Sequence, residues 1–151
     1  MKLILPFVIA ALFASQSMAQ DTTETAGNTV FSQNADADLK QFVWKKRPIV
    51  VFADSDAAPR YAEQIELLMA NLPTLEERDV VVLTDTDPSA RSALRLKLRP
   101  RGFMLVIIGL DGDVKLLKPF PWDVREISRS IDKMPLRKRE LREKKRTVSE
   151  N

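Results

Sequence analysis

The chain has 151 residues and a formal net charge of +3, and it contains neither cysteine nor histidine. The length predicts one domain, and the missing residue types exclude thiol redox chemistry, cysteine nucleophiles, Ser-His-Asp catalysis and the usual zinc sites. The side chains left for chemistry are carboxylates, Lys, Arg, Ser, Thr and one Tyr. We therefore expect a binding module rather than an enzyme, and we expect no cofactor.

Residues 1–19 have the pattern of a secretory signal peptide. Met1-Lys2 is a basic start, Leu3 to Phe13 is an apolar run, and Ser17-Met18-Ala19 offers small residues for cleavage. The apolar run is too short to span a bilayer, and an uncleaved anchor is the alternative interpretation. We expect a periplasmic or secreted protein with no transmembrane segment in the mature chain. Residues 20–37 are polar and lack periodicity, which predicts a disordered lead.

The folded domain is predicted over residues 38–136. Short apolar runs predict three buried strands, Pro48–Phe52, Asp79–Asp85 and Phe103–Ile108. Apolar residues at helical spacing predict helices that begin near Pro59, near Pro88 and near Trp122-Asp123, and Pro73 should end the first of them. Gly109-Leu110-Asp111-Gly112 predicts a hairpin turn into a fourth strand, Val114–Leu117.

The order of these elements is strand, helix, strand, helix, strand, strand, helix. A helical crossover makes the first two strands parallel, and the hairpin makes the last two antiparallel. This order predicts a thioredoxin-like, three-layer α/β sandwich, in which a central mixed sheet of about four strands is flanked by helices.

Four segments of the chain resemble one known family, and they are Trp44–Phe52, Glu77–Val80, Gly109–Lys115 and Ile131–Arg137 with Glu140. The family is DUF4174, a thioredoxin-like, peroxiredoxin-related domain of exported bacterial proteins and of animal extracellular proteins. The resemblance spans roughly residues 39–143. It implies the fold and an exported setting, and it implies no known activity.

The place of the thioredoxin Cys-x-x-Cys motif is taken here by Asp54-Ser55-Asp56-Ala57. Met104 stands about where a thioredoxin has a cis-proline before its third core strand. Disulfide exchange and peroxide reduction both need a thiolate, so we predict that the domain is redox-inactive.

Aspartates follow the first two predicted strands, with Asp54 and Asp56 after one and Asp85 and Asp87 after the other. If these strands are neighbours, the four carboxylates meet at one edge and offer the oxygen ligands that Ca²⁺ or Mg²⁺ prefer. That arrangement defines the alternative function, a divalent-metal-dependent hydrolase. The interpretation that we favour is that Asp56 and Asp87 cap helices and that Asp54 and Asp85 end strands in solvent.

A cluster of basic residues surrounds the second predicted helix and its exit, namely Arg91, Arg95, Lys97, Arg99 and Arg101. Arginines in such a cluster can bind an anionic ligand or pair with the aspartates above. The interpretation that we favour is a solvated helix face, which is the usual role of a run of charges.

Residues 137–151 form a basic C-terminal tail. Residues 137–146 contain seven Lys or Arg against two Glu, whereas residues 20–134 carry a formal charge of −2. We expect Arg137 and Glu140 to be docked on the domain. Lys144, Lys145 and Arg146 should remain free to contact an anionic surface or an acidic protein in the cell envelope. The tail lacks aromatic side chains for base stacking, so we expect no nucleic-acid partner.

Overall fold

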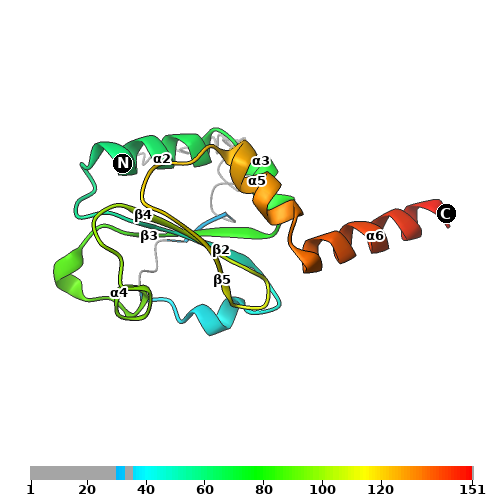
Figure 1. Ribbon diagram of the computed structural model, residues 1–151, viewed down its shortest axis with the longest axis horizontal. Coiled ribbons are helices and arrows are strands. Elements are labelled where there is room, and N and C mark those ends of the chain that lie inside the picture. The colour runs from blue at the N-terminus through cyan, green and yellow to red at the C-terminus, as the bar shows by residue number, and fades with distance from the viewer. Residues whose placement is uncertain (1–29, 33–35, 151) are drawn as a thin grey trace, which may run out of the picture.

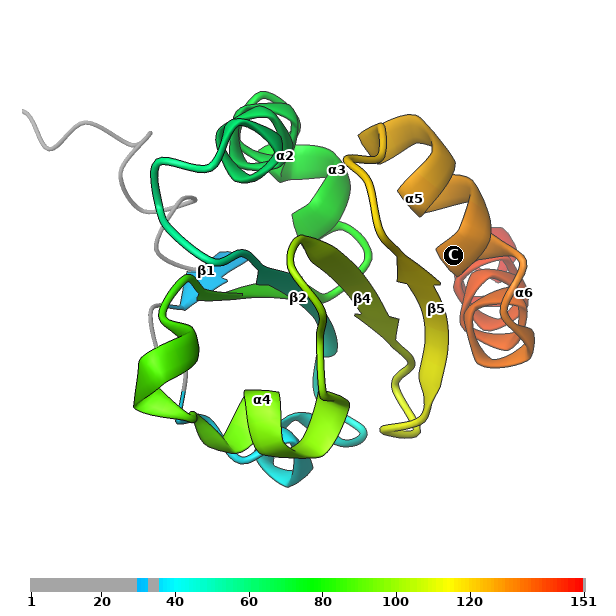
Figure 2. The ribbon, with the colours of Figure 1, turned by 60° about the vertical axis from the view of Figure 1, so that its left-hand side comes forward.

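The structure, a computed structural model, describes residues 30–32 and 36–150, so the predicted signal peptide lies outside the described residues. A five-stranded mixed sheet lies between helices on both of its faces (Figures 1 and 2). Its strands, in the spatial order β1-β3-β2-β4-β5, are β1 (Phe31–Ser32), β3 (Val80–Asp85), β2 (Arg47–Phe52), β4 (Met104–Ile108) and β5 (Val114–Lys118). The first three are parallel, and β4 is antiparallel to both β2 and β5. The predicted three-layer sandwich is confirmed.

The fifth strand, β1, lies in the segment that the sequence predicted as a disordered lead. Phe31 and Ser32 pair with Val82 and Leu83 of β3, and Val30 beside them is fully buried. The structure differs here because β3 has a second hydrogen-bonding edge, which a strand of two residues can occupy. Such a short apolar piece has no periodicity that a sequence pattern could register.

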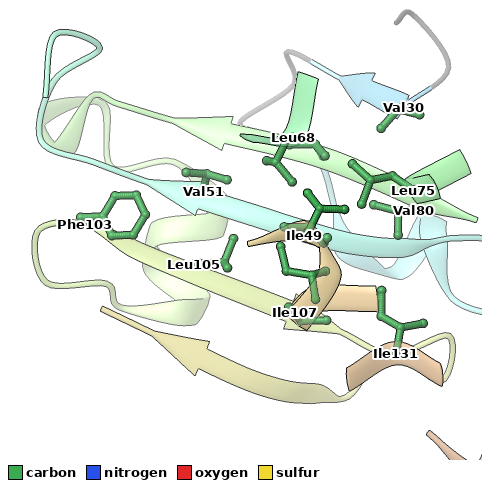
Figure 3. Packing of buried hydrophobic residues seen from close by; sticks show 13 residues of the cluster. Val30, Ile49, Val51, Leu68, Leu75, Val80, Phe103, Leu105, Ile107 and Ile131 are labelled. Carbon is green, nitrogen blue, oxygen red and sulfur yellow. The ribbon is translucent and has the colours of Figure 1, made fainter. Parts of the chain in front are cut away.

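One face of the sheet is covered by α2 (Pro59–Met69), α3 (Leu72–Glu76) and α5 (Val124–Asp132). Their buried side chains meet those of the strands in one apolar cluster, as Figure 3 shows for Leu68, Leu75 and Ile131 against Ile49 and Ile107. Pro73 does not end the helical region as predicted. It lies in the first turn of α3, where a missing N–H costs nothing.

The other face is covered by η1 (Leu39–Phe42) and α4 (Ala93–Leu98), which pack against Val50 and Phe52. The helix predicted from Pro88 is divided into η2 (Pro88–Ala90) and α4. Arg91 between them has a φ of 48°, and the Ser92 side chain then caps α4 by accepting a hydrogen bond from the Arg95 N–H. The sequence signal for Ser92 as an N-cap was hidden behind the stronger Asp87-Pro88 signal.

The last helix, α6 (Pro135–Ser149), follows α5 after a break at Lys133 and Met134 and extends away from the sheet (Figure 1). It runs through the boundary at residues 136 and 137 that the sequence predicted between domain and tail. No helix in residues 30–32 or 36–150 is both long enough and apolar enough to cross a membrane.

Candidate functional site

The first two predicted strands are neighbours, and the carboxyl ends of β2 and β3 lie side by side because Phe52 is in register with Asp85. Ligands of open α/β sheets bind at this edge. Asp85 is buried there with 4 % of its surface exposed. Its carboxylate accepts a hydrogen bond from the Ser92 hydroxyl and another from the Asp87 backbone N–H, at 3.2 Å.

Arg95 of α4 closes this edge. Its Nε donates to Asp85 Oδ1 at 2.8 Å, and its Nη2 donates to the backbone oxygens of Ala53, at 2.5 Å, and Asp85, at 3.0 Å. The guanidinium also lies over the Phe52 ring, 5.5 Å from the ring centroid. The sequence suggested several roles for Arg95, and the structure supports its pairing with an aspartate. The Arg95 guanidinium is already paired with Asp85.

The other three candidate metal ligands do not join Asp85. Asp54, Asp56 and Asp87 are exposed. Two of the favoured roles were wrong: Asp56 does not cap α2, whose N-cap is Ala58 without a side-chain hydrogen bond, and Asp85 is buried against Arg95 rather than in solvent. Asp87 caps η2, and the hydroxyl and backbone N–H of Ser89 hold the pKa of its carboxyl below the ordinary value. Within residues 30–32 and 36–150, no three His, Cys, Asp or Glu side chains gather closely enough to hold a metal ion. The arrangement lends no support to the metal-dependent hydrolase.

The remaining arginines of the basic cluster, Arg91, Arg99 and Arg101, are exposed. Arg91 and Arg99 follow η2 and α4 in the left-handed conformation, with φ values of 48° and 50°. They lie at helix ends rather than on one helix face. Their use as an anion site stays a prediction.

A second set of buried charges lies at the amino end of β2, and the sequence reasoning did not single it out as a site. Arg47, the first residue of β2, is 1 % exposed. Its Nη1 donates to the backbone oxygen of Arg78 at 2.9 Å, and its Nη2 donates to Glu140 Oε1 of α6 at 2.5 Å. A strand residue in the first third of the sequence thereby holds the last helix.

Three further residues extend this contact into a network. Arg78 forms a bidentate ion pair with Asp132 at the end of α5. Its Nε donates to Oδ1 at 3.1 Å, and its Nη2 donates to Oδ2 at 2.8 Å. Arg137 of α6 donates to Glu140 Oε2 at 3.1 Å, and its Nε lies 3.6 Å from Asp132 Oδ1. We call Arg47, Arg78, Asp132, Arg137 and Glu140 the anchor network.

The anchor network divides α6 into two parts. Arg137 is buried and Glu140 is half-buried, whereas every residue from Arg142 to Glu150 is exposed. The prediction that Arg137 and Glu140 are docked is confirmed. Lys144, Lys145 and Arg146 lie on the exposed part, and their contact with an anionic surface stays a prediction.

The sheet order and the two helix layers define the class of protein, a thioredoxin-like α/β domain. Reduced 2-Cys peroxiredoxin of Plasmodium vivax has a similar structure, with a TM-score of 0.53 and 20 % identity over 64 % of this chain and 81 % of that chain. Thioredoxin peroxidase I of Plasmodium yoelii is similar with a TM-score of 0.50 and 19 % identity, over 64 % of this chain and 76 % of that chain. At such identities the likeness shows the fold alone.

The family model described as Domain of unknown function (DUF4174) matches residues 38–140, and the chain belongs to this family. The resemblance found in the sequence is thereby confirmed. Among curated proteins none matches. The match ends at Glu140, and all five residues of the anchor network lie within it. All five also lie in three of the four segments that carry the resemblance, so ion pairs and hydrogen bonds join those three segments in space.

Proposed function

We propose that the domain is an exported, redox-inactive binding module that presents the exposed part of α6 to an anionic surface in the cell envelope. The observation that carries this proposal is the two-part helix. Ion pairs of the buried Arg47 and Arg137 with the half-buried Glu140 fix its first turns to the domain, while Lys144, Lys145 and Arg146 face solvent on its outer turns. A helix held in this way offers a cationic surface in a set direction, which a loose tail does not.

The absence of cysteine supports the redox-inactive part of the proposal. The carboxyl edge, where thioredoxin-like enzymes carry their thiols, holds instead the buried pair of Asp85 and Arg95. Purified protein should therefore show no thiol-dependent reduction of insulin disulfides and no consumption of peroxide.

Electrostatics supports an anionic partner. A basic residue near an anionic lipid surface contributes about 1 kcal/mol, and the attraction fades within the Debye length of about 8 Å at physiological salt. Lys144, Lys145 and Arg146 together would give weak binding that falls steeply as salt is added. Charge alone indicates the partner, because the family is described as a domain of unknown function.

The test is co-sedimentation with vesicles that contain phosphatidylglycerol, at low and at high salt. The chain without its signal peptide should bind at low salt and dissociate at high salt. Deletion of residues 144–151 should abolish binding and leave the melting temperature unchanged, because the anchor network lies before the deletion. Undiminished binding after the deletion would contradict the proposal, and so would a loss of many degrees in the melt.

A further inference from the structure

Trp44, in the loop between η1 and β2, exposes 65 % of its surface. Its φ is 63°, a backbone conformation that bulky residues rarely adopt. The Trp44 N–H holds this conformation by donating to the Leu110 oxygen in the β4–β5 turn, at 2.7 Å. The backbone is thus fastened while the largest apolar side chain in the loop is left in water.

Trp44 belongs to the same end of the sheet as the attachment of α6. Arg47 follows three residues later and reaches Glu140 of that helix. Lys45 and Lys46 lie between them, Lys45 exposed and Lys46 half-buried. Trp44, Lys45 and Lys46 therefore belong to the segment that leads directly into Arg47, the strand residue to which α6 is attached.

The exposed part of α6 also combines apolar and basic side chains. Val148 is 73 % exposed, which is more than Trp44. These two are the most exposed large apolar residues of the described part of the chain. Lys144 and Lys145 precede Val148 by one helical turn, so they share its side of the helix. Both of these strongly exposed apolar residues thus have lysines as neighbours.

We infer that Trp44 is an apolar anchor that enters the interface of an anionic lipid bilayer when the basic residues of α6 bind that bilayer. Tryptophan rings settle at the headgroup level of membranes, and lysine side chains extend along apolar surface while their charge stays in water. The inference rests on the proposed function and names its partner as lipid.

The chain contains two tryptophans, so one substitution makes Trp44 a single reporter. Trp122 is half-buried, and its ring lies 4.7 Å from Lys118 Nζ. In the Trp122→Phe variant, Trp44 emission should shift to shorter wavelength when phosphatidylglycerol vesicles are added at low salt. Brominated acyl chains should quench it. In the reciprocal Trp44→Phe variant, the emission of Trp122 should stay unchanged.

A second readout is affinity for the same vesicles. Trp44→Ala should weaken binding about tenfold, the effect of losing a partly inserted aromatic ring, and Trp44→Phe should weaken it less. Neither substitution should lower the melting temperature by more than a few degrees, because the side chain is exposed. These variants therefore separate membrane binding from folding.

Each contrary outcome has a distinct meaning. Salt-sensitive vesicle binding with no change in Trp44 emission would overturn the inference and leave the proposed function standing. Binding to soluble polyglutamate but not to vesicles would also overturn the inference, in favour of an acidic protein partner. Absence of binding to both probes would overturn the inference and the proposed function together.

Discussion

At the carboxyl end of β2 and β3, Arg95 and Asp85 form one ion pair across the edge of the sheet. At the amino end, the five charged side chains of the anchor network connect β2 to α5 and α6. The carboxyl-end pair is nearly buried, with side-chain exposures of 9 % for Arg95 and 3 % for Asp85. In the anchor network Arg47 and Arg137 are buried and Arg78 is partly buried, whereas the carboxylates of Glu140 and Asp132 are 31 % and 35 % exposed. The carboxyl-end pair fills the usual ligand edge of the fold, while the anchor network fixes a helix that faces outward.

Removal of one partner from the carboxyl-end pair should have the largest effect on stability. Asp85→Ala leaves the Arg95 cation buried without its partner, and we expect a loss of about 3–5 kcal/mol in the free energy of unfolding. Urea denaturation measures this loss. The double variant Asp85→Ala/Arg95→Met should recover much of it, because it removes the unpaired charge. As a matched control, Asp87→Ala removes an exposed helix cap and should lower the free energy of unfolding much less than Asp85→Ala does.

A double variant that is no more stable than Asp85→Ala would argue against an unpaired cation as the cause. The pair would then act mainly through its hydrogen bonds to Ala53 and Ser92.

Disruption of the anchor network should lower the free energy of unfolding less than Asp85→Ala does, because its carboxylates are partly exposed and can be hydrated. Arg47→Met should lower the free energy of unfolding by about 2–3 kcal/mol, the scale of hydrogen bonds to charged groups. Arg139→Met, which removes an equal charge from an exposed site on α6, should change it by less than about 0.5 kcal/mol. Hydrogen exchange should show that α6 loses protection in the first variant and keeps it in the second. Intact protection of residues 137–140 in Arg47→Met would show that the helix is held by other contacts.

The smallest effect is expected at the β4–β5 turn, where Lys115 Nζ lies 2.7 Å from Asp111 Oδ2. Burial raises the pKa of the Asp111 carboxyl, but the hydrogen bond and charge of Lys115 outweigh burial and hold it below the ordinary 3.8. The ionised form is thus favoured in the folded state. The pair should add less than about 1 kcal/mol above pH 3.8, and this is lost as the pH falls through the lowered pKa.

Asp111→Asn should therefore lower the melting temperature slightly near neutral pH, and the difference from the unsubstituted chain should vanish in acid. Thermal melts over a pH series check this. A difference that grows in acid would have the wrong sign for a carboxyl whose pKa is lowered by folding.

Local patterns predicted most of the fold. The apolar runs at Pro48–Phe52 and Phe103–Ile108 became β2 and β4, and Asp-Gly placed the hairpin turn, because each signal is contained within a few residues. Where two signals competed, as at Asp87-Pro88 and Ser92, the stronger one hid the other. β1 was missed because its pairing depends on the edge of β3, which is far away in the sequence.

The sites divide in the same way. The pairing of Arg95 with Asp85 was among the predicted roles because the two residues are only ten positions apart. Arg47 and Glu140 are separated by 93 positions, and an arginine before a strand has no periodicity that points to a partner. The family resemblance marked the right segments, but their contact follows from the fold and could not be obtained from their spacing.

We propose that anionic surfaces bind the exposed part of α6, which is attached at the amino end of β2, and do not bind basic residues in general. This proposal is tested by two double variants that change the charge equally, Lys144→Glu/Lys145→Glu on α6 and Lys97→Glu/Arg101→Glu beside the carboxyl end. All four side chains are exposed, so both proteins should fold. In co-sedimentation with phosphatidylglycerol vesicles at low salt, we expect the Lys144→Glu/Lys145→Glu variant to lose binding and the Lys97→Glu/Arg101→Glu variant to keep most of it. Equal losses, or a larger loss in the Lys97→Glu/Arg101→Glu variant, would contradict the proposal.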